Sequence, residues 1–288
     1  MPEDAMRHPA LERGRAAVIT GAASGIGLAV AERLAAIGMR LCLADRDAAA
    51  LEAARGQLAA TGAEVIAVPT DVSRREAVQA LRDRALEAFG EVAFLMNNAG
   101  REGGGALLNG DPAVWTATLD TNLFGAVHGM QLFGPAMAAS GRPGAIVNTG
   151  SKQGITAPPG DAAYNVSKGA LKLATEALAH ELRNIPGCQV TAHLLIPGFT
   201  FTGFTRRRQV HKKPAAAWTA EQVADFLLEG MGRGSFYVLC PDNDVTREMD
   251  ERRILWAAGD IVADRPALSR WHPDHAKAFA RFMAGRKD

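Results

Sequence analysis

A glycine-rich turn between an apolar run and an amphipathic stretch constrains the fold of this chain more than any other feature of its sequence. The turn reads Thr20-Gly21-Ala22-Ala23-Ser24-Gly25-Ile26-Gly27. Glycines at this spacing permit a tight turn and a close approach of the backbone to a pyrophosphate, and the helix that follows offers free N–H groups to the phosphates. An ordinary strand-to-helix turn would account for only one of the three glycines. The pattern therefore predicts a strand, a dinucleotide-binding turn and a helix.

A second pattern, a tyrosine and a lysine four positions apart, predicts acid–base chemistry. On a helix, Tyr164 and Lys168 would share one face, with their Cβ atoms about 5–6 Å apart. An ammonium group there favours the phenolate, so a tyrosine with a reference pKa of about 10 can act as an acid or base near neutral pH. Ser151 lies thirteen positions upstream, after an apolar run, where its hydroxyl would hold a carbonyl oxygen beside the phenol. Such a Tyr–Lys pair arises by chance in many helices, and its weight here comes from the glycine turn.

Together these residues resemble the short-chain dehydrogenase/reductase (SDR) family, in its single-domain branch. The resemblance covers about residues 14–240 and rests on the order and spacing of T-G-x-x-x-G-x-G, Asn97-Asn98-Ala99-Gly100, Asn122, Ser151, Y-x-x-x-K, and Pro197-Gly198 followed by Thr202. It implies a Rossmann fold and hydride transfer between a nicotinamide cofactor and an alcohol or a ketone.

The resemblance also implies roles for individual residues. The catalytic set would be Ser151, Tyr164, Lys168 and Asn122, with Asn122 at a local break in a helix, where it orders a water that touches Lys168. Asp71 and Val72 would hold the adenine, the turn at 98–100 would lie under the nicotinamide ribose, and Thr202 would bind the carboxamide. The expected cofactor site comprises Gly21, Ser24, Gly25, Ile26, Gly27, Asp45, Arg46, Asp71, Val72, Asn98, Ala99, Gly100, Tyr164, Lys168, Pro197, Gly198 and Thr202.

Apolar runs alternate with helical patterns along the chain, which predicts an α/β fold. The expected strands are Ala16–Thr20, Arg40–Ala44, Glu64–Pro69, Val92–Asn97, Ala145–Thr149, Gln189–Ile196 and Phe236–Cys240. The expected helices are Gly25–Ile37, Asp47–Ala60, Arg74–Phe89, Pro112–Ala139 and Ala162–Asn184. Continuous apolar strands with crossover helices favour a doubly wound parallel sheet of about seven strands, with helices on both faces and ligands at the carboxyl ends of the strands.

The chain of 288 residues is expected to form one domain. The predicted divisions are a flexible N-terminal segment over 1–13, a catalytic domain over 14–241 with a substrate lid at about 199–215, and a C-terminal extension over 242–288.

Composition excludes several other functions. A net charge of +1 gives no reason to expect nucleic-acid or membrane-surface binding, and no apolar run is long enough to span a membrane. Residues 1–13 do not resemble a secretory signal, and three cysteines far apart favour a reducing cytoplasm. His272 and His275 lack a third ligand nearby, so no metal site is expected.

The choice of cofactor depends on Asp45, which ends the second expected strand. An acidic residue there can accept hydrogen bonds from the adenosine ribose hydroxyls, and it repels a 2′-phosphate. Arg46 is the complication, since a basic residue there can bind that phosphate, but Asp45 and Asp47 flank it. We therefore expect NAD rather than NADP. Asp45 could alternatively cap the next helix, a task that Asp47 could perform instead.

The segment after Pro197-Gly198 is expected to form the substrate lid. Phe199, Phe201 and Phe204 are either the small core of the lid or the wall of an apolar pocket that also includes Ser151 and Tyr164. The basic run Arg206–Lys213 is either a solvated loop or a site for an anionic group of the substrate.

The C-terminal extension carries large apolar side chains, among them Trp256, Trp271, Phe279 and Phe282. Helices are expected at Val245–Ala258 and Asp274–Ala284. Because a solvated tail would not carry so much apolar surface, we expect the extension to pack on the domain or on a neighbouring subunit. A homodimer or homotetramer is expected, although the extension puts the usual tetramer in doubt.

The sequence thus predicts an NAD(H)-dependent oxidoreductase that interconverts a secondary alcohol and a ketone, with a bulky apolar or aromatic small molecule as substrate and Tyr164 as acid and base. Two alternatives remain open. One is an NADPH-dependent 3-oxoacyl-carrier reductase, and the other is a non-catalytic dinucleotide-binding sensor.

Overall fold

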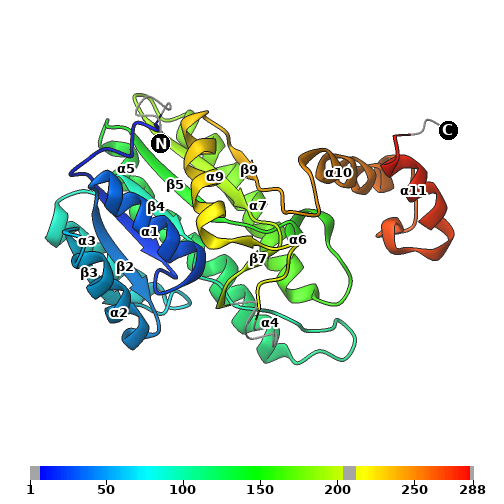
Figure 1. Cartoon of the computed structure of the whole chain (residues 1–288), viewed down its shortest axis with the longest axis horizontal. Helices are drawn as coiled ribbons and strands as arrows, with labels where there is room; N and C mark the ends of the chain where they lie inside the picture. The colour runs from blue at the N-terminus through cyan, green and yellow to red at the C-terminus, as the bar shows by residue number, and fades with distance from the viewer. Residues whose placement is uncertain (1–6, 204–211, 286–288) are drawn as a thin grey trace.

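The centre of the fold is a sheet of seven parallel strands, in the order β3-β2-β1-β4-β5-β6-β9 (Figure 1). The computed structural model describes residues 7–203 and 212–285. The chain runs outward from β1 to β3 and then returns to place β4 on the other side of β1. The predicted doubly wound sheet is therefore confirmed, and the reversal between β1 and β4 is where such folds bind their ligands. The strands are β1 (Ala16–Thr20), β2 (Arg40–Asp45), β3 (Val65–Pro69), β4 (Phe94–Asn97), β5 (Gly144–Thr149), β6 (Val190–Ile196) and β9 (Tyr237–Leu239).

Helices cover both faces of this sheet. One hydrophobic core joins the sheet to α1 (Gly25–Ile37), α2 (Ala48–Ala59) and α9 (Ala220–Gly232), and the other joins it to α3 (Arg75–Phe89), α5 (Gly125–Ala139) and α7 (Ala162–Arg183). Successive residues of a strand point to opposite faces, so Ala17 and Ile19 of β1 enter the first core, and Ala16 and Val18 enter the second. Because both faces are covered, the inner strands are mainly apolar, which made them visible in the sequence.

The helical stretch expected over Pro112–Ala139 is interrupted around Asn122, where the family resemblance implied a local break. It consists of α4 (Pro112–Leu119), a π-helical turn η1 (Asp120–Phe124) and α5. Asn122 lies in the π turn and is 1% exposed. π turns often occur at functional sites, and this one turns a buried asparagine toward the loop after β4.

The N-terminal segment differs from the flexible tail expected over residues 1–13, of which residues 1–6 lie outside the described residues. Ala10 and Leu11 are buried in the first core. His8 is buried as well, and its Nε2 shares a hydrogen bond of 3.0 Å with Thr191 Oγ1 on β6. The packed part of this segment was missed because it is too short to show an apolar period.

The C-terminal extension projects from the body beyond β9 (Figure 1). It consists of α10 (Arg247–Val262), two short 3₁₀ turns, η2 (Ser269–Trp271) and η3 (Pro273–His275), and α11 (Ala276–Met283). Trp256 is buried inside the extension, where its ring lies 5.3 Å from those of Phe279 and Phe282. Three of the four large aromatic residues thus form a small core of their own rather than packing on the sheet domain.

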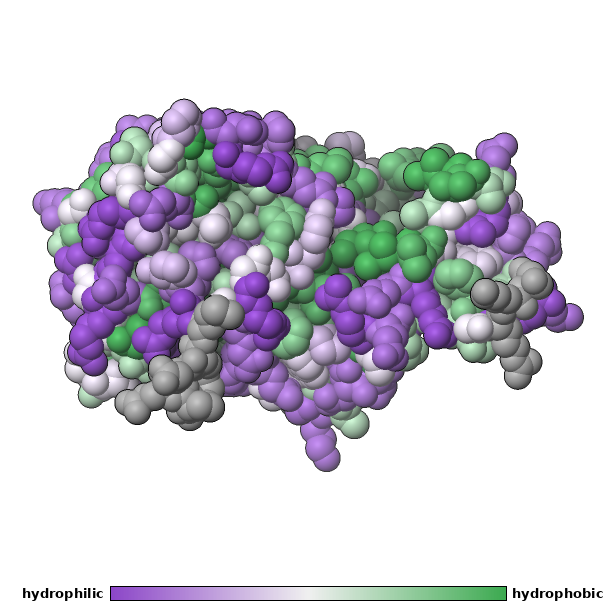
Figure 2. Space-filling view, turned by 90° about the horizontal axis from the view of Figure 1, so that it is seen from above, coloured by the Kyte–Doolittle hydropathy of each residue, from purple (hydrophilic) through white to green (hydrophobic). Residues whose placement is uncertain are grey.

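Apolar surface remains on the outside of the extension. Figure 2 shows green atoms over its helices, and the exposed apolar side chains there include Leu255, Ile261, Val262 and Trp271. The extension contacts the domain where α10 meets α6 (Gln153–Thr156), a short helix after β5. The expectation that the outer apolar surface packs on a neighbouring subunit stays a prediction.

The described residues show neither a membrane-spanning helix nor a cluster of metal ligands. Within residues 7–203 and 212–285, no helix has the length and hydrophobicity that a bilayer crossing requires. Over the same residues, no three His, Cys, Asp or Glu side chains come together in a way that could hold a metal ion.

Candidate active site

A cleft of about 760 Å³ lies at the carboxyl ends of the parallel strands, where the turns after β1 to β6 meet. Nearly all the residues predicted for the cofactor and the chemistry line it. They are Gly21, Ser24, Gly25, Ile26, Asp45, Arg46, Asp71, Val72, Asn98, Ala99, Gly100, Ser151, Tyr164, Lys168, Pro197, Gly198, Phe199 and Thr202.

The remaining predicted residues lie elsewhere. Gly27 packs behind the turn, Asn122 lies beneath the loop after β4, and Phe201 belongs to β7 (Thr200–Phe201), which pairs with β8 (Trp218–Thr219). Phe204 and residues 206–211 of the basic run lie outside the described residues. Of the rest of that run, Lys213 donates to the carbonyl of Ala217 at 2.6 Å.

The glycine turn is packed too closely for side chains. Gly21 has φ +65°, and a Cβ there would lie 2.9 Å from Ala99 Cα. A Cβ on Gly27 would lie 2.3 Å from the carbonyl oxygen of Gly21, so α1 can approach the turn only because Gly27 has no side chain. The start of α1 is thereby held against the cleft, where its dipole favours an anion.

Asp45 closes the next strand and faces the same cleft. One carboxylate oxygen accepts from the backbone N–H of Ala23 at 3.2 Å, and the other accepts from that of Asp47 at 3.1 Å. Asp47 itself caps α2 by accepting from the N–H of Ala50 at 3.0 Å. The helix cap is therefore Asp47, and Asp45 fixes the glycine turn while its carboxylate lines the cleft.

The turn after β4 joins the two halves of the cleft. Asn98 donates to the carbonyls of Thr20 and Gly21 at 3.1 and 3.3 Å, and its side-chain oxygen accepts from Thr149 Oγ1 at 3.2 Å. The amides of Asn98 and Ala99 both donate to Thr20 Oγ1. This turn is thus held by the glycine turn on one side and by the end of β5 on the other.

Ser151, Tyr164 and Lys168 meet in the cleft on the far side of that turn. Lys168 Nζ lies 5.8 Å from the centre of the Tyr164 ring and donates to the carbonyl of Thr149 at 2.7 Å. Lys168 is buried, and burial lowers its pKa to about 8. The hydroxyl oxygen of Ser151 accepts from the N–H of Gln153 at 3.2 Å, which fixes the position of its oxygen at the end of β5.

Asn122 supports this group from below. Its side-chain oxygen accepts from the N–H of Arg101 at 2.8 Å, and its amide donates to the carbonyl of Arg101 and to Ser167 Oγ, on the same helix as Tyr164 and Lys168. The side chain therefore ties the π turn to the loop after β4 and to α7.

Several cleft residues were not predicted. The additional lining includes Arg101, Glu102, Thr149, Lys152 and Gln153. Lys152 and Gln153 directly follow Ser151 in the sequence, and Arg101 directly follows the turn at 98–100, so the signal that could have revealed them is adjacency to a motif. A neighbouring hollow of about 450 Å³ shares Glu102 and Gln153 and is walled in part by Pro158 and Pro159.

Comparisons with known proteins agree with this geometry. The short chain dehydrogenase family matches residues 15–213. The chain is 34% identical over 244 residues to a 1-deoxy-11-beta-hydroxypentalenate dehydrogenase of Streptomyces avermitilis, a match that covers 83% of this chain and 89% of that one.

Two solved structures extend the comparison. A short chain dehydrogenase/reductase from Burkholderia phymatum in complex with NAD has a TM-score of 0.79 and 38% identity, over 88% of this chain and 96% of that one. An alcohol dehydrogenase from the archaeon Thermococcus sibiricus complexed with 5-hydroxy-NADP has a TM-score of 0.66 and 28% identity, over 74% of this chain and 88% of that one.

Proposed function

The chain belongs to the short-chain dehydrogenase family, and from this premise we propose that it is an NAD(H)-dependent oxidoreductase that interconverts a secondary alcohol and a ketone. The observation that carries the proposal is that Ser151, Tyr164 and Lys168 line one cleft together with the glycine turn. An acid–base group and an anion-binding turn in one cleft are what hydride transfer to or from a dinucleotide requires.

The residues of the cleft fit a dinucleotide. The turn at 21–26 offers a close-packed backbone and a helix start for a pyrophosphate, and Asp45 and Asp71 offer carboxylates for the adenosine half. Asn98, Ala99 and Gly100 would lie under the nicotinamide half, with Thr202 beside it. When bound, the nicotinamide would supply hydride acceptance or donation at its C4 carbon.

Tyr164 is proposed to exchange a proton with the substrate oxygen. The Lys168 ammonium, 5.8 Å from the ring centre, stabilises the phenolate form, and its bond to the Thr149 carbonyl holds it there. The pKa of Lys168 is lowered only to about 8, so the amine keeps its charge at neutral pH. Ser151 would donate a hydrogen bond to the same substrate oxygen and thereby place the carbinol carbon toward the nicotinamide site.

We propose NAD rather than NADP on the charge around the second strand. Asp45 and Asp47 both line the cleft beside Arg46, so a 2′-phosphate there would meet two carboxylates and one guanidinium. Asp45 is also held in place by two backbone N–H groups, which keeps its carboxylate at the end of β2.

The proposed substrate is a bulky secondary alcohol or ketone with an apolar or aromatic body. Phe199 lines the cleft and is 41% exposed, and Pro158 and Pro159 wall the adjoining hollow, so both cavities offer apolar surface to a substrate. The relative from Streptomyces avermitilis carries the name of a hydroxypentalenate as its substrate, which supports this size class.

We also propose that the protein is a homo-oligomer. Val166 and Leu173 on α7 are exposed apolar residues on a helix that a single chain leaves uncovered there. Light scattering coupled to size exclusion would give the number of chains, and a monomer at micromolar concentration would contradict the proposal.

A screen of secondary alcohols with NAD⁺ and with NADP⁺, followed by the absorbance of the reduced nicotinamide, tests the function. We expect turnover of bulky alcohols with NAD⁺. Activity confined to NADPH and 3-oxoacyl substrates would instead identify a carrier reductase, and cofactor binding without any turnover would identify a sensor.

A further inference from the structure

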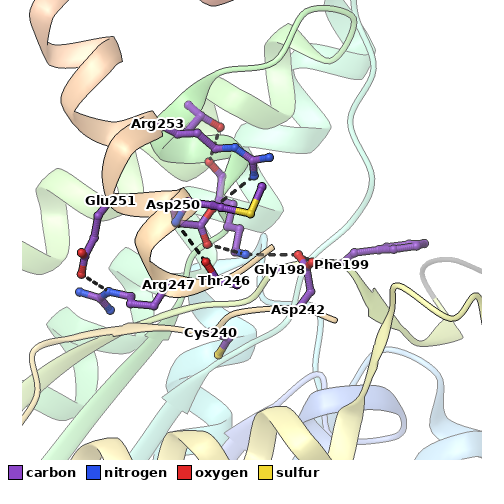
Figure 3. A network of polar contacts seen from close by, with 12 residues as sticks. Gly198, Phe199, Cys240, Asp242, Thr246, Arg247, Asp250, Glu251 and Arg253 are labelled. Atoms are coloured by element: carbon purple, nitrogen blue, oxygen red, sulfur yellow. Dashed lines mark hydrogen bonds and ion pairs between the residues drawn. The ribbon is translucent and has the colours of Figure 1, made fainter. Parts of the chain in front are cut away.

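A buried ion network connects the C-terminal extension to the residue next to Ser151. The ammonium of Lys152 lies 2.6 Å from Asp250 Oδ2 on α10 and 3.2 Å from Asp242 Oδ2 in the segment after β9. Figure 3 shows the two carboxylates converging on this nitrogen. The side chains of Lys152, Asp242 and Asp250 are only 15%, 7% and 5% exposed. Charges buried to this degree are stable only when they are paired, so each of these residues depends on the others.

The network connects two segments that line the cleft, the one that follows Ser151 and the one at 197–199. The N–H of Lys152 donates to the carbonyl of Pro197 at 3.3 Å, and the N–H of Phe199 donates to Asp242 Oδ2 at 3.5 Å. Gly198 lies between these contacts, and a Cβ there would be 2.8 Å from Asp242 Oδ2 and 2.9 Å from Lys152 Nζ. The ion pair between Lys152 and Asp242 therefore lies directly against the backbone of the segment after β6.

Helix α10 of the extension supplies the closer of the two carboxylates. Asp250 is in the first turn of α10, which Thr246 caps by accepting from the N–H of Met249 at 3.3 Å. Arg253 Nη1 lies 3.5 Å from the other oxygen of Asp250. One turn along, Ile254 packs with Ile155 of α6 on the small core that contains Leu239. These contacts hold the first turns of α10 against the residues that follow Ser151.

We propose that Asp250 is a positioning residue for the reaction: by holding Lys152 it fixes the Ser151 hydroxyl relative to the segment at 197–199. This inference rests on the proposed dehydrogenase function. It makes the extension a part of the active-site support rather than an appendage. Asp250 itself lines neither of the two hollows described above, so its influence passes through Lys152.

The variant that tests it is Asp250→Asn, which keeps the shape of the side chain and removes its charge. We expect kcat for alcohol oxidation to fall about tenfold, since small displacements of a positioned group slow the chemical step strongly. The dissociation constant of NADH, read from protein fluorescence, should stay within twofold. The kinetic isotope effect for substrate deuterated at the carbinol carbon should rise, because hydride transfer becomes more rate-limiting, and Asp250→Glu should restore part of the rate.

Glu251→Gln is the matched control. Glu251 is the next residue on α10, and its ion pair with Arg247 is about half exposed and lies away from the network (Figure 3). It should leave kcat and the isotope effect unchanged. If Asp250→Asn lowered kcat with an unchanged isotope effect and only a lower melting temperature, the residue would be merely structural and the inference would be wrong.

A second measurement does not depend on turnover. Hydrogen exchange followed by mass spectrometry should show faster exchange in the segments 151–156 and 197–203 of Asp250→Asn than in the parent protein or in Glu251→Gln. Unchanged exchange in both segments would overturn the inference. Failure of the parent protein to oxidise any alcohol would instead count against the proposed function, so the two failures are distinguishable.

Discussion

Asn122 and Arg101 are paired through the backbone of Arg101: the asparagine oxygen accepts from its N–H at 2.8 Å, and the asparagine amide donates to its carbonyl at 3.0 Å. This reciprocal pairing holds the loop after β4 above the π turn, directly beside Gly100. A Cβ on Gly100 would lie 3.5 Å from Asn122 Oδ1 and 3.9 Å from Lys168 Nζ, so Gly100 lies between the asparagine and the lysine proposed for catalysis.

Replacing Asn122 with alanine should therefore weaken both the fold and the reaction. The change leaves the Arg101 N–H and carbonyl without this partner in a partly buried place, and each such loss costs about 1–3 kcal/mol of unfolding free energy. We expect a lower denaturation midpoint and a reduced kcat. Asn184→Ala, which removes an exposed asparagine at the end of α7, is the control. Equal midpoints for the two variants would contradict the role given to Asn122.

Tyr164→Phe should abolish turnover, about a thousandfold or more, because it removes the group proposed for proton transfer. NADH binding should remain, since the ring and Lys168 keep their places. Tyr237, the other tyrosine of the chain, provides the control: its hydroxyl bonds to Glu176 and it does not line the cleft. If Tyr164→Phe kept substantial activity, or if Tyr237→Phe lost as much, the proposed mechanism would be wrong.

Asp45→Asn should narrow the preference for NAD⁺ over NADP⁺ in kcat/KM. Asparagine retains an oxygen that can accept from the N–H of Ala23, so the glycine turn is less disturbed than with alanine, while the charge that repels a 2′-phosphate is lost. Asp47→Asn removes the same charge two residues away and keeps the cap of α2. Equal use of both cofactors by the parent protein would refute the argument and implicate Arg46 as a phosphate ligand.

The free energy of unfolding should decrease as the pH is lowered from 7 to 5, because His8 is buried in its neutral form. Burial lowers its pKa to about 4, and its Nδ1 accepts from the N–H of Ala10 at 3.1 Å, a bond that protonation would break. Since the reference pKa is about 6.5, the unfolded chain binds a proton in this range before the folded chain does, and about 2 kcal/mol of unfolding free energy is lost by pH 5.

Urea unfolding at several pH values would measure the slope of the unfolding free energy against pH. His8→Asn should flatten it, whereas His180→Asn, at an exposed histidine on α7, should leave it as it is. The same slope in all three proteins would show that the N-terminal segment does not act as a pH-sensitive contact.

Trp256→Ala should unfold the extension while the sheet domain persists. The indole packs on Phe279 and Phe282, lies under the Arg265 guanidinium and donates to Ser269 Oγ, all within the extension. Removal of the indole should lower the unfolding free energy of the extension by about 3–5 kcal/mol. Limited proteolysis should cut the variant within residues 247–283 first. Trp271→Ala, at a 37% exposed site, should resist like the parent protein, and equal resistance of Trp256→Ala would show that the aromatic core does not hold the extension.

Elements with a periodic apolar pattern, and site residues that belong to a motif of fixed spacing, could be predicted from the sequence. β1 was visible because a strand covered on both faces is mainly apolar. The helix at Pro112–Ala139 was predicted without its exact form, because a π turn depends on what Asn122 meets in space. β7 was missed because two residues carry no period.

The ion network at Lys152 could not be read from the sequence for a different reason. Its partners Asp242 and Asp250 lie far along the chain, and in the sequence they resemble any surface carboxylate. The same holds for His8, whose partner Thr191 lies on β6. Such contacts are fixed only when the sheet brings the ends of distant strands to one edge.

The ion network also fixes the order in which these contacts can form during translation. Lys152 leaves the ribosome before Asp242 and Asp250 do. Its ammonium group therefore stays hydrated and unpaired with these carboxylates until β9 and the first turns of α10 have left the exit tunnel. The wall of the cleft beside Ser151 can therefore close only after α10 has been synthesised, and a nascent chain that still lacks α10 would already carry Ser151, Tyr164 and Lys168 but not the nearer partner of Lys152.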